Sequence, residues 1–154
     1  MFEEEDELFD PQFHSELERY EKMMESKEAY YFDPEVLERI VDHFIIKNHL
    51  KKALTAIEFG MDQHPSCAVF SLRKAQIFST TGKLKESLLI LQELEKTEPF
   101  NTEIFITKAS VFSQLRDHEK AIKYFEKAID TALEYEDGED VEDIRFDLAL
   151  EYEN

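Results

Sequence analysis

Apolar and small residues recur along this chain at a step of 34 residues. Three phenylalanines share one position of the step: Phe44, Phe78 and Phe112. Three small residues share the position nine places later: Ala53, Ser87 and Ala121. A third position is bulky in each copy: Ile57, Leu91 and Phe125. Several residue classes that keep one register over three copies indicate a stack of helix pairs.

The same pattern predicts where the helices begin and end. Asp33 precedes Pro34, as an N-cap precedes the first turn of a helix, and Gly82 can take the left-handed turn conformation. Pro65 and Pro99 close the second helices of the first two pairs, whereas no proline closes the third, so its second helix should run long. The expected segments are about 13–27, 34–47, 50–63, 67–80, 84–97, 102–115, 118–135 and 141–154.

These segments divide the chain into six parts: an acidic N-terminal tail (1–11), an N-terminal capping helix region (12–31), three repeats (32–66, 67–100 and 101–135), and an acidic loop with the first helix of a partial fourth repeat (136–154). In the last part, Leu148, Ala149 and Tyr152 match the large, small and aromatic positions of a first helix. Six of the nine residues from Ile144 to Tyr152 are apolar, more than one helix face needs. We therefore expect an excised or N-terminal portion of a longer array, with self-association through this C-terminal end.

Helix packing predicts the core. Two helices approach to about 8–10 Å only where a small side chain lies between them, with a large ring beside it. The side chains expected to be buried are Phe44, Phe78, Phe112, Ala53, Ala121 and Phe125. The capping helix should pack through one face formed by Phe13, Leu17, Tyr20 and Met24.

Charge and composition narrow the choice of partners. The formal net charge of −18 lies mostly in the ends, since residues 1–10 carry six acids and no base, and residues 134–154 carry ten acids and one base. Nucleic acids and anionic membranes are disfavoured, because both require a basic surface. A single cysteine, Cys67, and the lack of an export signal fit a reducing, cytoplasmic location.

Residues for catalysis or metal binding do not stand out. The five histidines form no HExxH pair, the three glycines are too far apart for a phosphate loop, and the Asp137–Asp140 loop lacks the ligands of a calcium site. We expect no catalytic residue, no cofactor and no metal, and therefore no enzyme.

The repeats resemble the tetratricopeptide repeat (TPR) family. The residues at its six signature places are Val41, Phe44, Ala53, Ile57, Gly60 and Pro65 in the first unit, Ala75, Phe78, Ser87, Leu91, Leu94 and Pro99 in the second, and Ala109, Phe112, Ala121, Phe125, Ala128 and Leu133 in the third. One departure is that the family's seventh-place leucine is replaced by Ile40, Lys74 and Lys108. The resemblance implies an all-α fold, a right-handed α-solenoid of antiparallel helix pairs.

The resemblance also implies a function. TPR arrays serve as non-enzymatic scaffolds that bind a peptide or protein segment on a concave face lined by first helices. The implied binding residues are Glu35, Glu38, Asp42, Leu72, Gln76, Ile106, Ser110 and Gln114. Their acidic and apolar character favours a partner with basic and apolar side chains, and the absence of basic groups argues against a carboxylate clamp.

Two alternatives stay open. The chain is also compatible with a docking or regulatory segment of a longer multidomain protein whose activity lies outside it. The chain's own acidic tail, with Phe2 and Phe9, could also lie along an apolar part of the surface.

Overall fold

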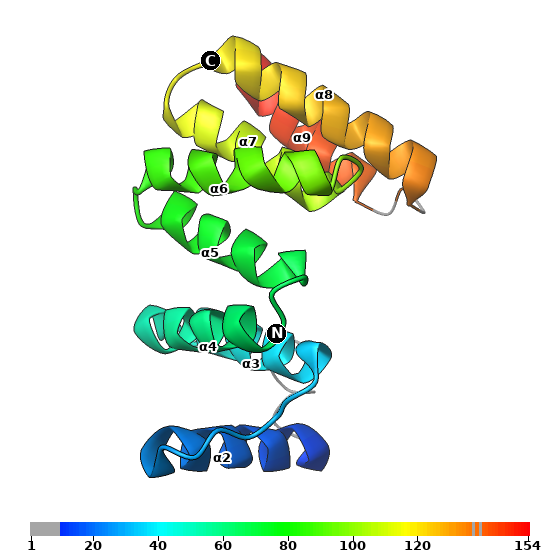
Figure 1. Ribbon diagram of the computed structural model, residues 1–154. Helices are drawn as coiled ribbons and strands as arrows, with labels where there is room; N and C mark the ends of the chain where they lie inside the picture. Colours follow the sequence, from blue (N-terminus) through cyan, green and yellow to red (C-terminus); the bar gives the residue numbers. More distant parts are fainter. Residues whose placement is uncertain (1–9, 137, 139) are drawn as a thin grey trace. The chain divides into compact units, whose positions relative to one another are not determined.

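The computed structural model describes residues 10–136, 138 and 140–154. Within that part of the chain the secondary structure is all helical, as expected, with eight helices and no strand (Figure 1). The helices are α2 (Pro11–Ser26), α3 (Pro34–Ile46), α4 (Leu50–Gln63), α5 (Ala68–Thr80), α6 (Leu84–Thr97), α7 (Thr102–Gln114), α8 (His118–Tyr135) and α9 (Val141–Tyr152). None of these described helices is long and apolar enough to span a membrane.

The helices divide between two compact units, Met1–Cys67 (unit 1) and Ala68–Asn154 (unit 2). Unit 1 contains α2, α3 and α4, and unit 2 contains α5 to α9. The further division into three repeats and a partial fourth stays a prediction.

The helix bounds agree with the sequence pattern to within one residue for the six helices from α3 to α8. The largest difference at a helix start is in α2, which begins at Pro11 rather than near Phe13. The cause is Asp10, whose carboxylate accepts hydrogen bonds from the backbone N–H groups of Gln12 (3.0 Å) and Phe13 (3.3 Å). Asp10 therefore acts as the N-cap of the first helix.

The turn within each helix pair repeats at the 34-residue step. Asn48, Gly82 and Arg116 all have positive φ, at 58°, 84° and 60°. Next to each of them, a backbone N–H donates to the carbonyl of the repeated phenylalanine: His49 to Phe44 (2.8 Å), Lys83 to Phe78 (2.9 Å) and Asp117 to Phe112 (2.9 Å). This six-to-one hydrogen bond with a left-handed residue is the Schellman ending of a helix.

In unit 1, an aromatic cluster joins α2 to the α3–α4 pair. The Tyr20 ring lies 6.0–6.2 Å from those of Phe32, Phe44 and Phe59. Near the start of α2, the Phe13 ring packs edge-on against His43 at 5.6 Å. Aromatic rings in these geometries add to the stabilisation given by their burial.

The predicted packing face of α2 is wrong at its last position. Met24 is 42% exposed, and Met23 is buried in its place. Met23 faces the segment that follows α2, where the backbone N–H of Tyr30 lies 3.2 Å from its sulfur. The returning chain thus covers Met23 and leaves Met24 on the outside.

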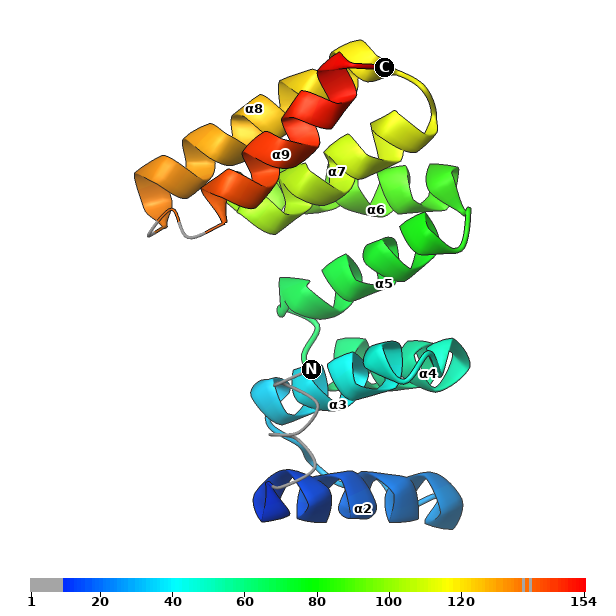
Figure 2. The ribbon, with the colours of Figure 1, turned by 180° about the vertical axis from the view of Figure 1, so that it is seen from behind.

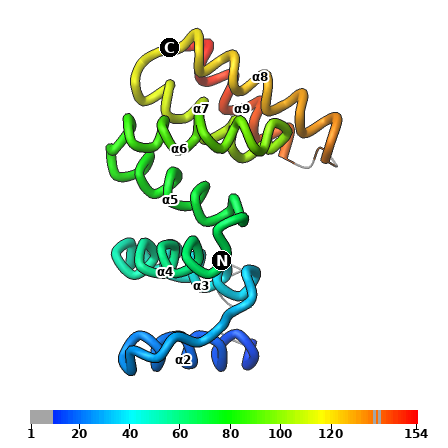
Figure 3. The backbone as a smooth tube through the Cα atoms, in the orientation of Figure 1, coloured from blue at the N-terminus to red at the C-terminus, as the bar shows by residue number. Residues whose placement is uncertain are grey.

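In unit 2, all five helices from α5 to α9 contribute side chains to one hydrophobic core. Figure 3 traces the backbone of these helices. The small repeat positions are completely buried in both units, and the Ser87 hydroxyl also donates to the Ala75 carbonyl at 2.7 Å. The predicted burial is confirmed for all but one of the six residues. The exception is Phe78, which is half-buried, and the ammonium groups of Lys74 and Lys83 lie over its ring at 5.9 Å and 5.2 Å.

The last helix packs differently from the predicted register. Figure 2 shows α9 lying along α8, and its buried stripe contains Val141, Ile144 and Glu151. Ala149 and Tyr152 are exposed, so their assignment to the small and aromatic core positions is wrong. The buried face instead includes Glu151, whose carboxylate accepts a hydrogen bond from Ser113 and contacts His118.

Candidate functional site

The candidate binding residues of unit 1 lie on α3 at spacings of three and four, hence on one helix face. Glu35 is exposed in the first turn of α3, and Glu38 and Asp42 are half-buried. Both half-buried carboxylates already interact with other groups of the protein. Glu35, Glu38 and Asp42, here called the α3 stripe, therefore form a negatively charged helix face. Contacts within the protein help to position two of its three carboxylates.

The candidate residues of unit 2 take part in a polar ladder between the first helices α5 and α7. Three cross-helix hydrogen bonds form this ladder: Arg73 to Glu103 (3.2 Å), Gln76 to Thr107 (3.4 Å) and Gln114 to Ser79 (3.1 Å). Arg73 also donates to the amide oxygen of Gln76 at 3.0 Å. Two of the predicted residues, Gln76 and Gln114, are thus held in place by neighbours on the facing helix.

The other predicted residues of unit 2 differ in exposure. Leu72 is only 3% exposed and belongs to the hydrophobic core, so it offers little surface to a partner. Ile106 is half-buried against the same core, and Ser110 is half-buried. Whether the α3 stripe and these residues form one groove stays a prediction.

A buried ionic network in unit 2 was not expected from the sequence. The Lys108 ammonium, in a side chain only 4% exposed, donates to Glu95 at 2.5 Å and to the Tyr124 hydroxyl at 3.0 Å. Lys127 contacts the other oxygen of the same carboxylate at 2.8 Å. The sequence signal was present, because Lys108 stands where the family has a leucine.

The network shifts both pKa values toward the charged forms. Desolvation raises the pKa of Glu95, but the hydrogen bonds from Lys108 and Lys127 outweigh it, so the pKa is lowered. Desolvation likewise lowers the pKa of Lys108, and the hydrogen bonds with Glu95 and Tyr124 outweigh it, so the pKa is raised. The buried lysine is therefore a charged structural element.

A buried carboxylate attaches α9 to the rest of unit 2. Glu151 is 4% exposed and accepts a hydrogen bond from the Ser113 hydroxyl of α7 at 2.7 Å. Its other oxygen contacts Nδ1 of His118 at the start of α8. One carboxylate thus links three helices.

His64 has a structural role, because it holds the segment that precedes α3. His64 Nε2 is 2.7 Å from the carbonyl oxygen of Phe32, and Gln63 holds the same segment through Tyr30 and Phe32. In the part of the chain described, no three His, Cys, Asp or Glu residues are grouped so as to hold a metal ion.

The C-terminal helix leaves apolar side chains on the surface. Phe146, Leu150 and Tyr152 are 65%, 45% and 62% exposed. Self-association through this end stays a prediction. Two other expectations reach outside the described residues: the acidic loop, at residues 137 and 139, and the acidic tail with Phe2 and Phe9.

Several solved structures share this fold. The TPR2B domain of yeast Sti1, in a structure titled as a complex with pHsp70, has 14% identity over 78% of this chain and 96% of that chain, with a TM-score of 0.70. The first TPR domain of human RPAP3 has 16% identity over 79% and 96%, with a TM-score of 0.60. The first TPR of Spaghetti (RPAP3) bound to the HSP90 peptide SRMEEVD has 17% identity over 75% and 93%, with a TM-score of 0.59. At these identities the likeness shows the fold, a TPR α-solenoid.

The sequence itself matches a family as well. No curated protein matches the chain. Residues 38–141, about two thirds of the chain, match the family described as "Psidin, N-terminal TPR repeats region". The chain therefore belongs to this family of tetratricopeptide repeats.

Proposed function

We propose that this protein is a non-enzymatic interaction scaffold that binds a peptide or protein segment along its first helices. The observation that carries the proposal is the polar ladder between α5 and α7. Its side chains are ordered by cross-helix hydrogen bonds before any ligand arrives, which lowers the entropic cost of binding. Two of the structural neighbours bear titles that name a bound peptide or a complex, and this supports a ligand of the same kind.

The charge of these helices favours a partner with basic side chains. Glu35, Glu38 and Asp42 on α3 and Glu103 on α7 are acidic, whereas Arg73 on α5 is already paired with Glu103. Ile106 adds apolar surface at the edge of the core. We therefore propose a segment that carries Lys or Arg beside bulky apolar residues, with charge steering the encounter and apolar contacts supplying most of the affinity.

The test is a selection of peptides from a random 12-residue display library on the full chain. Peptides rich in Lys, Arg and bulky apolar residues are expected, with affinity that falls modestly as salt rises. Each is then measured against the double variant Glu38→Lys, Asp42→Lys and against Gln114→Arg. Both variants should weaken binding by about tenfold or more, because they place positive charge against a basic ligand.

A matched control exchanges two exposed neighbours on α6, Lys85→Glu with Glu86→Lys, and leaves the net charge unchanged. This control should bind the selected peptides as the wild type does. Unchanged binding in the α3 and α7 variants would refute the proposal, because the ligand would then use another surface. Leu72→Asp is unsuitable as a test, since it places a charge in the core.

A further inference from the structure

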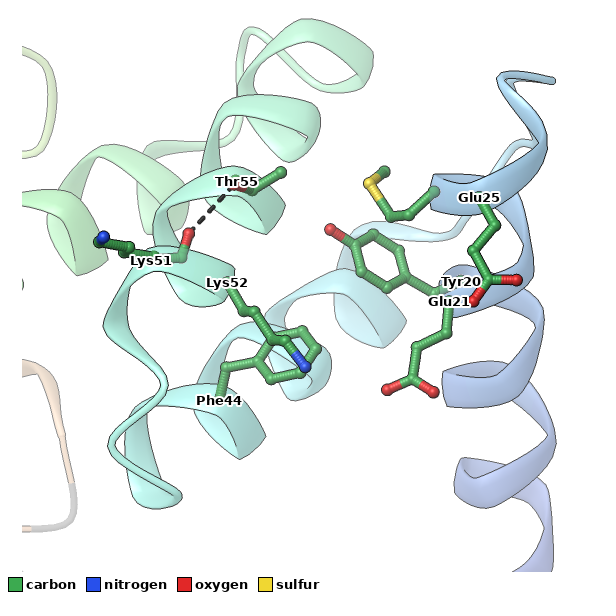
Figure 4. A pocket seen from close by; sticks show the side chains of 8 residues that line it. Tyr20, Glu21, Glu25, Phe44, Lys51, Lys52 and Thr55 are labelled. Carbon is green, nitrogen blue, oxygen red and sulfur yellow. Dashed lines mark hydrogen bonds between the residues drawn. The ribbon is translucent and has the colours of Figure 1, made fainter.

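A pocket of about 470 Å³ lies within unit 1, between α2 and the α3–α4 pair (Figure 4). Its apolar lining consists of Tyr20, Met24 and Phe44. In Figure 4 the Tyr20 ring projects from α2 toward α4, and its centroid is 6.2 Å from that of Phe44. This volume is in the range of sites that take a bulky apolar group, roughly 300–1,000 Å³. None of the lining residues belongs to the predicted concave-face set.

The Tyr20 hydroxyl is an unused donor in this pocket. The residue is 97% buried, since only 3% of it is exposed, yet its hydroxyl makes no hydrogen bond with any described residue and points into the pocket in Figure 4. Burial raises the pKa of Tyr20 to about 12, so the phenol keeps its proton at neutral pH. Among the described residues, the fully buried side-chain polar atom without a partner is Thr102 Oγ1, so the Tyr20 hydroxyl is instead open to the pocket and can donate to an acceptor atom of a ligand.

The two walls of the pocket carry opposite charges. Glu21 and Glu25 stand on α2, and Lys51 and Lys52 stand on α4. All four are exposed, and in the described structure no ion pair joins one wall to the other. The Lys52 ammonium lies 5.9 Å from the centre of the Phe44 ring, at the edge of the apolar lining. The acidic wall and the basic wall are therefore both accessible to a molecule that binds between them.

We propose that this pocket is a second docking site, which takes one bulky apolar side chain from a partner peptide. The Tyr20 hydroxyl donates to a carbonyl oxygen of that peptide. A basic residue on one side of the anchor meets Glu21 and Glu25, and an acidic residue on the other side meets Lys51 and Lys52. The pocket thus selects a segment with opposite charges flanking an apolar anchor, and this requirement is distinct from that of the first-helix surface.

The probes are three synthetic 13-residue peptides, blocked at both ends, with a central anchor. Two have a phenylalanine anchor, with Lys four residues before it and Glu four residues after it, or the two exchanged; the third carries alanine as the anchor. Each is titrated into the ¹⁵N-labelled full chain and followed by amide NMR. One charge order should bind more tightly and shift the amides of the pocket residues, and the alanine peptide should bind at least about tenfold more weakly, because the buried anchor is lost.

Two variants distinguish specific binding in this pocket from nonspecific hydrophobic binding. Tyr20→Phe keeps the ring and removes only the hydroxyl, and should weaken the preferred peptide by about three- to tenfold, as the loss of one hydrogen bond does. The exchange of all four charges (E21K, E25K, K51E and K52E) should reverse which charge order binds better. The Lys85→Glu, Glu86→Lys control and the Glu38→Lys, Asp42→Lys variant should leave both results unchanged, which separates this site from the first-helix surface.

The proposal is overturned if no peptide shifts the pocket amides, or if Tyr20→Phe and the charge exchange leave the affinities unchanged. Two further results would assign another occupant and overturn it equally. Shifts of the pocket amides with protein concentration alone would identify a second copy of the chain. Shifts on Phe9→Ala without peptide would identify the chain's own N-terminal segment.

Discussion

The two units hold their helices together by different means. In unit 1, aromatic rings join α2 to the α3–α4 pair, and the guanidinium groups of Arg19 and Arg39 lie over Phe32 and Phe13 at 4.4 Å and 4.5 Å. Unit 2 adds two carboxylates, Glu95 and Glu151, that are largely or fully buried and bridge between helices.

The difference shows how one repeat pattern allows two kinds of packing. Aromatic rings tolerate some irregularity in how they meet, and the α2 interface includes an open pocket beside them. A buried ion pair requires good geometry and complete pairing, so it favours one arrangement of its helices over others. Unit 2 should therefore be sensitive to the loss of single charges, whereas unit 1 should be sensitive to the loss of rings.

The largest expected effect concerns the rings of unit 1. Phe44→Ala should lower the free energy of unfolding by about 3–5 kcal/mol, through lost burial and the cavity that remains. Urea unfolding followed by circular dichroism measures this. Phe78→Ala, at the same repeat position but half-buried, should cost only about 1–2 kcal/mol, because less apolar area is lost. Equal losses in the two variants would contradict this interpretation of the core.

The next effect concerns the ionic network of unit 2. Glu95→Gln should cost about 3 kcal/mol, because the buried ammonium of Lys108 loses its counter-charge. Lys108→Leu, which restores the residue type of the family, should change stability by no more than about 1 kcal/mol, since a well-packed apolar side chain often replaces a buried ion. The same urea experiment compares them. If Lys108→Leu were the more damaging of the two, the pair would contribute more than its desolvation costs.

The pH dependence sharpens the same comparison. Because the pKa of Glu95 is lowered, its stabilising contribution is present above its ordinary value of 4.5 and is lost as pH falls through the lowered value. The pKa of Lys108 is raised, so its contribution is present below its ordinary value of 10.5 and is lost as pH rises through the raised value. Lowering the pH from 7 to 3 should therefore destabilise the wild type more than Lys108→Leu, as measured by thermal unfolding. Equal losses of stability in the two proteins over this pH range would argue against the network as the cause.

The smallest effect concerns the turn that both units share. Arg116 takes a left-handed conformation at the place where Asn48 and Gly82 stand in the other copies. Arg116→Gly should raise the free energy of unfolding by about 0.5–1 kcal/mol, because the strain of a side chain at positive φ disappears. Gly82→Ala is the converse control: it should cost about 1 kcal/mol although its added Cβ meets no atom within 4 Å. A stabilising Gly82→Ala would refute the argument from backbone strain.

Local rules explain why so much of the fold was predictable. The 34-residue step, the Asp33-Pro34 helix start and the prolines after α4 and α6 act through neighbouring residues, so the bounds of α3 to α8 could be read directly from them. The candidate site was less predictable. Gln76 and Gln114 were chosen from their places in the repeat, but the ladder that holds them requires Thr107 and Ser79 on facing helices.

The sequence by itself thus determined the helices from α3 to α8, their turns and most of the small and large core positions, because each depends on spacing along one chain. Only the tertiary structure decided which charges are buried. Lys108 reaches Glu95 across 13 positions of sequence, and Glu151 reaches Ser113 across 38. It also decided that Met23 rather than Met24 packs inside, and that Tyr20 faces a pocket, because these outcomes depend on how helices distant in sequence meet. The periodicity along the chain does not encode which residues of distant helices come into contact.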